Sequence, residues 1–209
     1  MFTIGFFAQK GGPGKTTLSI HASVQAAELY RVFVGDADGQ ESLWKWGKSR
    51  PFDTPTIERV SGVTLKEKLV GVAGRGFELA IVDCPPHGDA WAAKIAEALD
   101  FAVVPCRPSR LDLEAVGDAV RVLEGVGVPY VFVLNQARAQ STRKNASAIK
   151  ALSSWGPVCP FMVPRLDAYE DALNDGRAVT EFAPGGKAAD AVRAAWGWIF
   201  QNALSRVKP

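Results

Sequence analysis

The chain has 209 residues, of which 47% are hydrophobic and 22% are charged. This balance is typical of a folded globular protein and excludes a fibrous chain or bulk disorder. Its 24 Lys and Arg residues against 22 Asp and Glu residues give a formal net charge of +2, which by itself is too small to indicate a nucleic-acid partner.

The sequence also lacks the features of secreted and membrane proteins. No stretch of about 18 apolar residues occurs, and no basic segment precedes the first apolar run at residues 2–8. We therefore expect neither a transmembrane helix nor a signal peptide. The 3 cysteines show no paired spacing, which argues against a disulfide framework or a structural zinc site and favours the reducing cytosol.

Short apolar runs alternate with helix-compatible stretches along the chain. The expected strands are residues 2–8, 31–35, 77–82, 101–105, 129–134 and 158–163. The expected helices are residues 16–30, 64–73, 89–99, 112–125, 142–153 and 187–207. Continuously apolar strands are buried on both faces, so the pattern predicts an α/β fold with a mostly parallel central sheet and helices on both faces. Because the chain has no repeats and no long linker, we expect a single domain over residues 1–209.

A glycine-rich turn separates the first expected strand from the first expected helix. It reads Gly11-Gly12-Pro13-Gly14-Lys15-Thr16-Thr17. This matches the end of the phosphate-binding pattern G-x-x-x-x-G-K-[ST], although Gln9 stands where the first glycine would be. Glycines let backbone N–H groups converge on an anion, the helix N-terminus adds its positive end, and Lys15 adds a charge. Thr16 is expected to place its hydroxyl on Mg²⁺, so ATP or ADP with Mg²⁺ is the predicted cofactor.

Together with Lys10, the turn resembles the deviant Walker A loop of the ParA/MinD group of P-loop ATPases. The resemblance continues at Asp36-Ala-Asp38-Gly-Gln40 and at Ile81-Val-Asp83-Cys-Pro-Pro86, which is similar to the group's Walker B and switch II segment. It extends to Val163-Pro164-Arg165 and to residues 176–184, and so covers essentially the whole chain. No helix-turn-helix segment precedes the loop, so the chain looks like a short ParA-type partition ATPase with the P-loop NTPase fold.

The resemblance implies roles for individual residues in ATP hydrolysis. Lys15 becomes the phosphate lysine, and Lys10 reaches across an ATP sandwich dimer toward the nucleotide of the other subunit. Asp38 positions the attacking water, and Asp36 assists through Mg²⁺-bound water. Asp83 is expected to hold Mg²⁺ directly or through water, together with Thr16 and Asp38. Gly39 stands where the group usually has proline, which predicts a looser switch with slow hydrolysis or an altered trigger.

Two strand ends are expected beside the base of the nucleotide. Asn135 follows the strand at residues 129–134, and Pro164 and Arg165 follow the expected strand at residues 158–163. Ligands of open α/β sheets lie at this edge, and the resemblance supports Pro164 and its neighbours as the adenine-side loop. For Asn135 the sequence leaves a simple strand-end cap as an equal alternative.

Residues 125–166 contain no acidic side chain and five basic ones. These are Arg138, Arg143, Lys144, Lys150 and Arg165. Arg143, Ser147 and Lys150 have helical spacing, so they form a row that can lie along phosphates, or simply a solvated basic face. The resemblance implies that an ATP homodimer binds DNA without sequence preference through the residues Arg138, Arg143, Lys144 and Lys150. It also implies that a ParB-like activating protein stimulates the hydrolysis that releases the DNA.

The expected function is thus an ATP-dependent positioning ATPase for a plasmid, a chromosome or another large cargo. We expect it to be cytoplasmic, and nucleoid-associated when ATP is bound. One alternative is a MinD-like ATPase that binds membranes through its C-terminal helix, where Trp196, Trp198 and Phe200 are suggestive. Because this helix has few cations and no flexible linker, we expect it to pack on the sheet, without a membrane partner. The other alternative is an enzyme of the same fold that uses ATP to activate a carboxylate.

Overall fold

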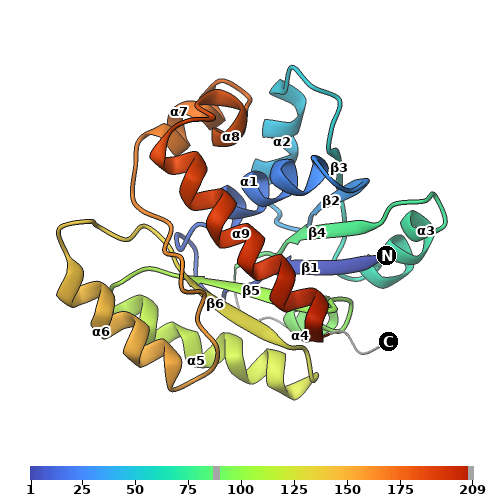
Figure 1. The fold of residues 1–209 in the computed structure, drawn as a ribbon. Helices are drawn as coiled ribbons and strands as arrows, with labels where there is room; N and C mark the ends of the chain where they lie inside the picture. Colours follow the sequence, from blue (N-terminus) through green and yellow to red (C-terminus); the bar gives the residue numbers. More distant parts are fainter. Residues whose placement is uncertain (87–89, 207–209) are drawn as a thin grey trace.

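The computed structural model describes residues 1–86 and 90–206, and these residues form one six-stranded sheet (Figure 1). The strand order is β3-β2-β4-β1-β5-β6, and every pairing is parallel. The strands are β1 (Phe2–Phe6), β2 (Val32–Asp36), β3 (Thr56–Arg59), β4 (Leu79–Asp83), β5 (Phe101–Cys106) and β6 (Tyr130–Leu134). The predicted α/β fold with a parallel central sheet is confirmed.

Helices cover both faces of the sheet (Figure 1). They are α1 (Lys15–Ala27), α2 (Ser42–Ser49), α3 (Leu65–Ala73), α4 (Ala90–Ala96), α5 (Arg110–Gly125), α6 (Thr142–Ser153), α7 (Ala168–Asn174), α8 (Val179–Phe182) and α9 (Lys187–Arg206). Alternate strand residues point to opposite faces, so Ile81 belongs to the apolar layer that includes α1 and α9, whereas Val82 belongs to the layer that includes α3, α4, α5 and α6. The resulting two apolar layers explain why the inner strands read as continuous apolar runs.

The prediction of a sixth regular strand at residues 158–163 is wrong. Only isolated bridges join this region to its neighbours, at Phe132 with Val158 and at Ala137 with Pro164. Prolines at positions 157, 160 and 164 lack the N–H that a continuous ladder requires. The segment therefore runs beside β6 with only a few hydrogen bonds, such as that from the Val163 N–H to the Leu134 carbonyl.

Other differences concern elements that the apolar pattern did not reveal. The sequence predictions omitted β3, α2, α7 and α8, which are short elements between the loop motifs. The first strand ends at Phe6 rather than at residue 8. Helices were expected to begin at residue 89 and to end at residue 207, and both positions lie outside the described residues.

The C-terminal helix α9 packs on the sheet, as its helical spacing predicts. Trp196 is buried, and its ring stacks on that of Phe6 with centroids 6.3 Å apart. The rings of Tyr30 and Phe200 lie 5.0 Å apart. Across the described residues, no helix has the combination of length and apolar character that spanning a membrane requires.

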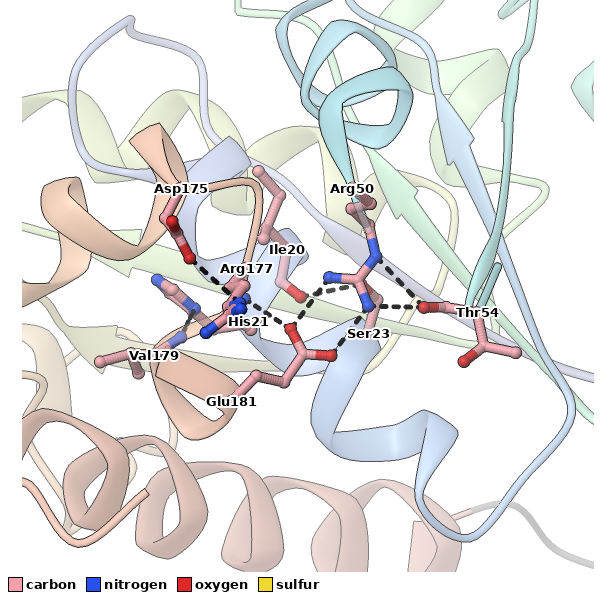
Figure 2. Close-up of polar contacts among 10 residues, drawn as sticks. Ile20, His21, Ser23, Arg50, Thr54, Asp175, Arg177, Val179 and Glu181 are labelled. Carbon is pink, nitrogen blue, oxygen red and sulfur yellow. Dashed lines mark hydrogen bonds and ion pairs between the residues drawn. The ribbon is translucent and has the colours of Figure 1, made fainter. Parts of the chain in front are cut away.

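A polar junction joins α1, α2 and α8, as Figure 2 shows. The Arg50 side chain is only 2% exposed, and its guanidinium donates to both carboxylate oxygens of Glu181 at 3.0 and 2.8 Å. Nη2 of the same guanidinium donates to the Thr54 carbonyl at 2.6 Å. In α8, the Val179 N–H donates to Nδ1 of His21 on α1 at 3.1 Å. This junction holds the end of α2 against the C-terminal part of the chain.

Candidate nucleotide-binding site

The glycine loop between β1 and α1 has the backbone of an anion cradle. Gly12 and Gly14 both have a φ of +94°, a conformation that residues with a Cβ rarely adopt. A Cβ on Gly14 would also collide with Nδ2 of Asn135. Gly14 precedes α1, whose first turn carries no acidic residue and no side-chain cap. The first N–H groups of the helix are therefore available to an anion, as predicted for a phosphate loop.

Lys15 lies inside this loop with only 5% of its surface exposed. Its ammonium Nζ lies 3.4 Å from the Lys10 carbonyl oxygen, to which it donates. Burial lowers the pKa of Lys15, and the nearby carboxylates of Asp83 and Asp38 oppose that shift. A buried cation is costly without a compensating charge, and a phosphate bound in the loop would supply that charge.

Asp83, Thr16 and Ser19 form a cluster directly beneath the loop. The Thr16 hydroxyl donates to Oδ2 of Asp83 at 2.7 Å, and the Ser19 hydroxyl lies 3.2 Å from Oδ1. Asp83 ends β4 in register with Phe6 and Asp36, which places it at the carboxyl edge of the sheet. Burial, reinforced by the charge of Asp36, raises the pKa of Asp83 to about 7.

This cluster fits Mg²⁺, because a hydroxyl and a carboxylate are the hard oxygen donors that Mg²⁺ prefers. The protein alone does not supply a full set of metal ligands, since residues 1–86 and 90–206 contain no group of three or more His, Cys, Asp or Glu side chains able to hold a metal ion. The expected Mg²⁺ site therefore depends on the phosphates of a nucleotide for its remaining ligands. Thr16 would hold the ion, with Asp83 beside it.

The two aspartates that follow β2 occupy different positions. The carboxylate of Asp36 is buried and accepts the N–H of Asp38 at 3.1 Å and the N–H of Trp44 at 2.9 Å. Asp36 thus holds the start of α2 against the sheet, and burial raises its pKa. Asp38 is half-buried, and its carboxylate accepts the N–H of Gln40 at 3.0 Å. Both residues lie near the loop, and their roles toward water remain predictions.

Lys10 and Gly39 lie at the exposed rim of the site. The Lys10 ammonium donates to the Leu111 carbonyl at 3.3 Å, in the first turn of α5. A Cβ on Gly39 would meet nothing within 4 Å, so packing does not require glycine there. The function of Lys10 across a dimer interface and the effect of Gly39 on hydrolysis remain predictions.

A cleft of about 460 Å³ adjoins the loop on the β6 side. Its lining brings together Asn135, Pro164 and Arg165, which the sequence placed near the base, and Thr17 of the glycine loop. The Asn135 amide already contacts the loop, because its Nδ2 donates to the Pro13 carbonyl at 2.8 Å. Asn135 therefore fastens the phosphate loop, which favours a structural role over direct contact with the base.

Arg107 and Gln136, like Ser19, were not predicted as residues of the site. The Arg107 guanidinium pairs with both carboxylate oxygens of Asp112 at 3.0 and 3.1 Å and lies beside Gly12. Gln136 donates from Nε2 to the Gly12 carbonyl at 3.3 Å. Each follows the end of a strand, β5 or β6, so the rule that ligand sites lie at the carboxyl edge identifies these positions.

The basic segment divides into a cleft and an exposed row. Arg138, Lys144 and Arg165 line a second cleft of about 440 Å³ together with Arg107 and Gln136. Arg143, Ser147 and Lys150 instead lie exposed along α6, with the helical spacing that was predicted. The five basic residues thus divide between the lining of this second cleft and the exposed face of α6.

Comparison with known proteins identifies the family. Residues 4–179 match the model of the CobQ/CobB/MinD/ParA nucleotide binding domain. The maintenance of carboxysome distribution protein A of Halothiobacillus neapolitanus is 31% identical over 199 residues, which cover 90% of this chain and 91% of that protein.

Two solved structures have the same fold. Apo McdA of Cyanothece has a TM-score of 0.81 and 17% identity, covering 98% of this chain and 99% of that chain. The septum site-determining protein MinD of Pyrococcus horikoshii, complexed with Mg-ADP, has a TM-score of 0.79 and 18% identity, covering 100% and 99%. The chain therefore belongs to the CobQ/CobB/MinD/ParA nucleotide-binding family, and it is an ATPase of the ParA/MinD type.

Proposed function

We propose that this protein positions a large cargo by an ATP-driven cycle of dimerisation and DNA binding. ATP with Mg²⁺ joins two copies in a nucleotide sandwich, the dimer holds DNA without sequence preference, and a ParB-like partner stimulates the hydrolysis that releases it. The observation that carries this proposal is the phosphate loop, in which buried Lys15 and the Thr16–Asp83 pair meet at the open N-terminus of α1.

The residues of the site divide the chemistry among them. The N–H groups at the start of α1 and the Lys15 ammonium bind the phosphates and stabilise the charge that develops on them. When bound beside Thr16 and Asp83, Mg²⁺ supplies further neutralisation of phosphate charge. Asp38 orients the attacking water, and Lys10 of a second copy brings another cation to the transferred phosphoryl group. The base lies in the cleft bordered by Pro164 and Arg165.

The name of a relative favours one class of cargo. The Halothiobacillus protein is named for maintaining the distribution of carboxysomes, which are large assemblies rather than DNA molecules. We therefore propose a large cytoplasmic assembly as the cargo in preference to a plasmid or a chromosome. The nucleoid would provide the DNA along which the ATP-bound dimer is held.

The oligomeric state tests this cycle most directly. We expect the Asp38→Ala protein to form a dimer with ATP and a monomer with ADP, when its mass is measured by light scattering, because ATP is retained without the water-positioning carboxylate. The Lys15→Ala protein should remain a monomer with either nucleotide, because it loses the main phosphate contact. If the Asp38→Ala protein stays a monomer with ATP, the sandwich-dimer mechanism is contradicted.

A further inference from the structure

Gln136, the second residue after β6, has an unusual backbone conformation. Its φ is +53°, in the left-handed region that residues other than glycine seldom adopt. The neighbouring peptide groups are held on both sides, because the Asn135 N–H donates to the Cys106 carbonyl at 2.8 Å and the Ala137 N–H donates to the Val163 carbonyl at 3.0 Å. Such conformations persist where the surroundings impose them, and they are concentrated at functional sites.

The conformation brings two successive amide side chains to two successive carbonyls of the phosphate loop. Gln136 donates from Nε2 to the Gly12 carbonyl at 3.3 Å, and Asn135 donates from Nδ2 to the Pro13 carbonyl at 2.8 Å. In a trans peptide the C=O and the N–H point in opposite directions. The contact from Asn135 therefore aims the Gly14 N–H away from β6.

The Gly12 carbonyl needs a different kind of restraint. Its peptide group ends at Pro13, which has no N–H, so this unit presents only a carbonyl oxygen to an anion. The negative end of that dipole would repel a phosphate in the loop. A hydrogen bond from Gln136 holds the oxygen toward the β6 side, where it is paired.

We propose that Gln136 is a positioning residue for the phosphate loop, which orients the Gly12 carbonyl away from the nucleotide phosphates. This inference rests on the proposed binding of ATP in that loop. The side-chain hydrogen bond of Gln136 goes to a backbone carbonyl of the loop, so Gln136 acts by orienting that backbone. It therefore affects how tightly ATP and ADP bind, and it has little influence on the hydrolysis of bound ATP.

Gln136→Met tests the amide, because methionine has a similar length and no hydrogen-bond donor. We expect the dissociation constants of fluorescent ATP and ADP analogues to rise about fivefold for both nucleotides, as for the loss of one amide–carbonyl hydrogen bond. KM for ATP should rise by the same factor, while kcat at saturating ATP stays within about twofold. Gln140→Met is the matched control, because Gln140 is exposed and lines neither cleft.

Gln136→Asn separates the backbone conformation from the amide. Asparagine adopts positive φ more readily than glutamine, so the unfolding temperature without nucleotide should equal or exceed that of the wild type. Its amide is one methylene shorter, so nucleotide affinity should still fall. Opposite effects on stability and affinity are not expected from a residue that only stabilises the fold.

Three results would overturn the inference. They are wild-type affinity for ATP and ADP in Gln136→Met, an equal loss of affinity in Gln140→Met, and unfolding of both Gln136 variants in the absence of nucleotide. If the wild type itself bound no ATP, the proposed function would fail and this inference with it. If instead the wild type binds, Lys15→Ala does not bind and Gln136→Met binds normally, only the role of Gln136 is refuted.

Discussion

His21 and Asp83 are both buried ionisable residues, and burial acts on them in opposite directions. His21 accepts the Val179 N–H on Nδ1, and within the described part of the chain its Nε2 has no hydrogen-bond partner. Burial lowers the pKa of His21 to about 3, so the imidazole is neutral in the folded protein. Burial raises the pKa of Asp83 to about 7, so the nucleotide-free protein binds a proton there more readily than the unfolded chain.

These shifts predict two opposing contributions to the pH dependence of stability. The His21 contribution is complete above the ordinary pKa of 6.5 and is lost as the pH falls toward 3. The Asp83 contribution is complete below the ordinary pKa of 3.8 and is lost as the pH rises through about 7. Each amounts to about 1 to 2 kcal/mol between pH 7.5 and 5.5.

Urea unfolding of the nucleotide-free protein at those two pH values tests both contributions. Relative to the wild type, the His21→Gln protein should gain stability on acidification, because only the Asp83 contribution remains. Asp83→Asn should lose stability over the same interval. A wild-type pH dependence in either variant would show that the residue does not titrate as its burial implies.

At the scale of elements, α2 is held at both ends by residues outside the helix. At the start of α2, Asp36 accepts the N–H of Trp44 in the first turn. At its end, Arg50, which directly follows the helix, pairs with Glu181 of α8 (Figure 2). Gly176 lies so close to this end that a Cβ there would be 2.5 Å from the Ser49 carbonyl oxygen. The loop with Asp38 is thus connected through α2 to the segment of α7 and α8, and α7 lines the cleft bordered by Pro164 and Arg165.

Glu181→Gln should destabilise the protein by about 2 kcal/mol in urea unfolding, because Arg50 then remains a buried charge without a charged partner. The exposed pair of Arg59 and Glu41 provides a matched control, with side-chain exposures of 57% and 33%. Glu41→Gln should cost less than about 1 kcal/mol. Equal losses in the two variants would contradict a special role for the buried pair.

At the scale of the whole molecule, positive charge is unevenly distributed along the chain. The net charge of +2 conceals a segment of residues 125–166 without acidic side chains. Part of this segment lines the second cleft, which shares Arg107, Gln136 and Arg165 with the cleft proposed to hold the base. The remainder, including Arg143 and Lys150, is exposed on α6. In the proposed cycle, dimerisation would double the number of these cations and so make DNA binding depend on ATP.

Replacing Arg143 and Lys150 together by Glu should weaken binding to arbitrary duplex DNA at least about tenfold and flatten its salt dependence. Gel shifts with ATP at several salt concentrations measure both effects, and ATP binding should be retained. Lys66→Glu combined with Arg121→Glu makes the same change in net charge at exposed positions of α3 and α5. If that control weakens DNA binding equally, the α6 row has no specific role.

A single domain over residues 1–209 remains a prediction.

The sequence by itself determined the parallel α/β fold, the phosphate loop and the positions of Lys15, Thr16 and Asp83. These features depend on local properties of the chain, such as glycine conformations, apolar runs and the residue types at strand ends. It predicted a regular strand at residues 158–163 where prolines interrupt the ladder, and it missed the short elements β3, α2, α7 and α8.

Only the tertiary structure decided what surrounds the phosphate loop. Asn135 and Gln136 contact carbonyls that lie 122 and 124 positions earlier in the chain. Spacing along the sequence carries no signal at that distance, because the contacts depend on the strand order of the sheet. For the same reason, the burial of Arg50 against Glu181 emerged only when the folded chain brought these residues together.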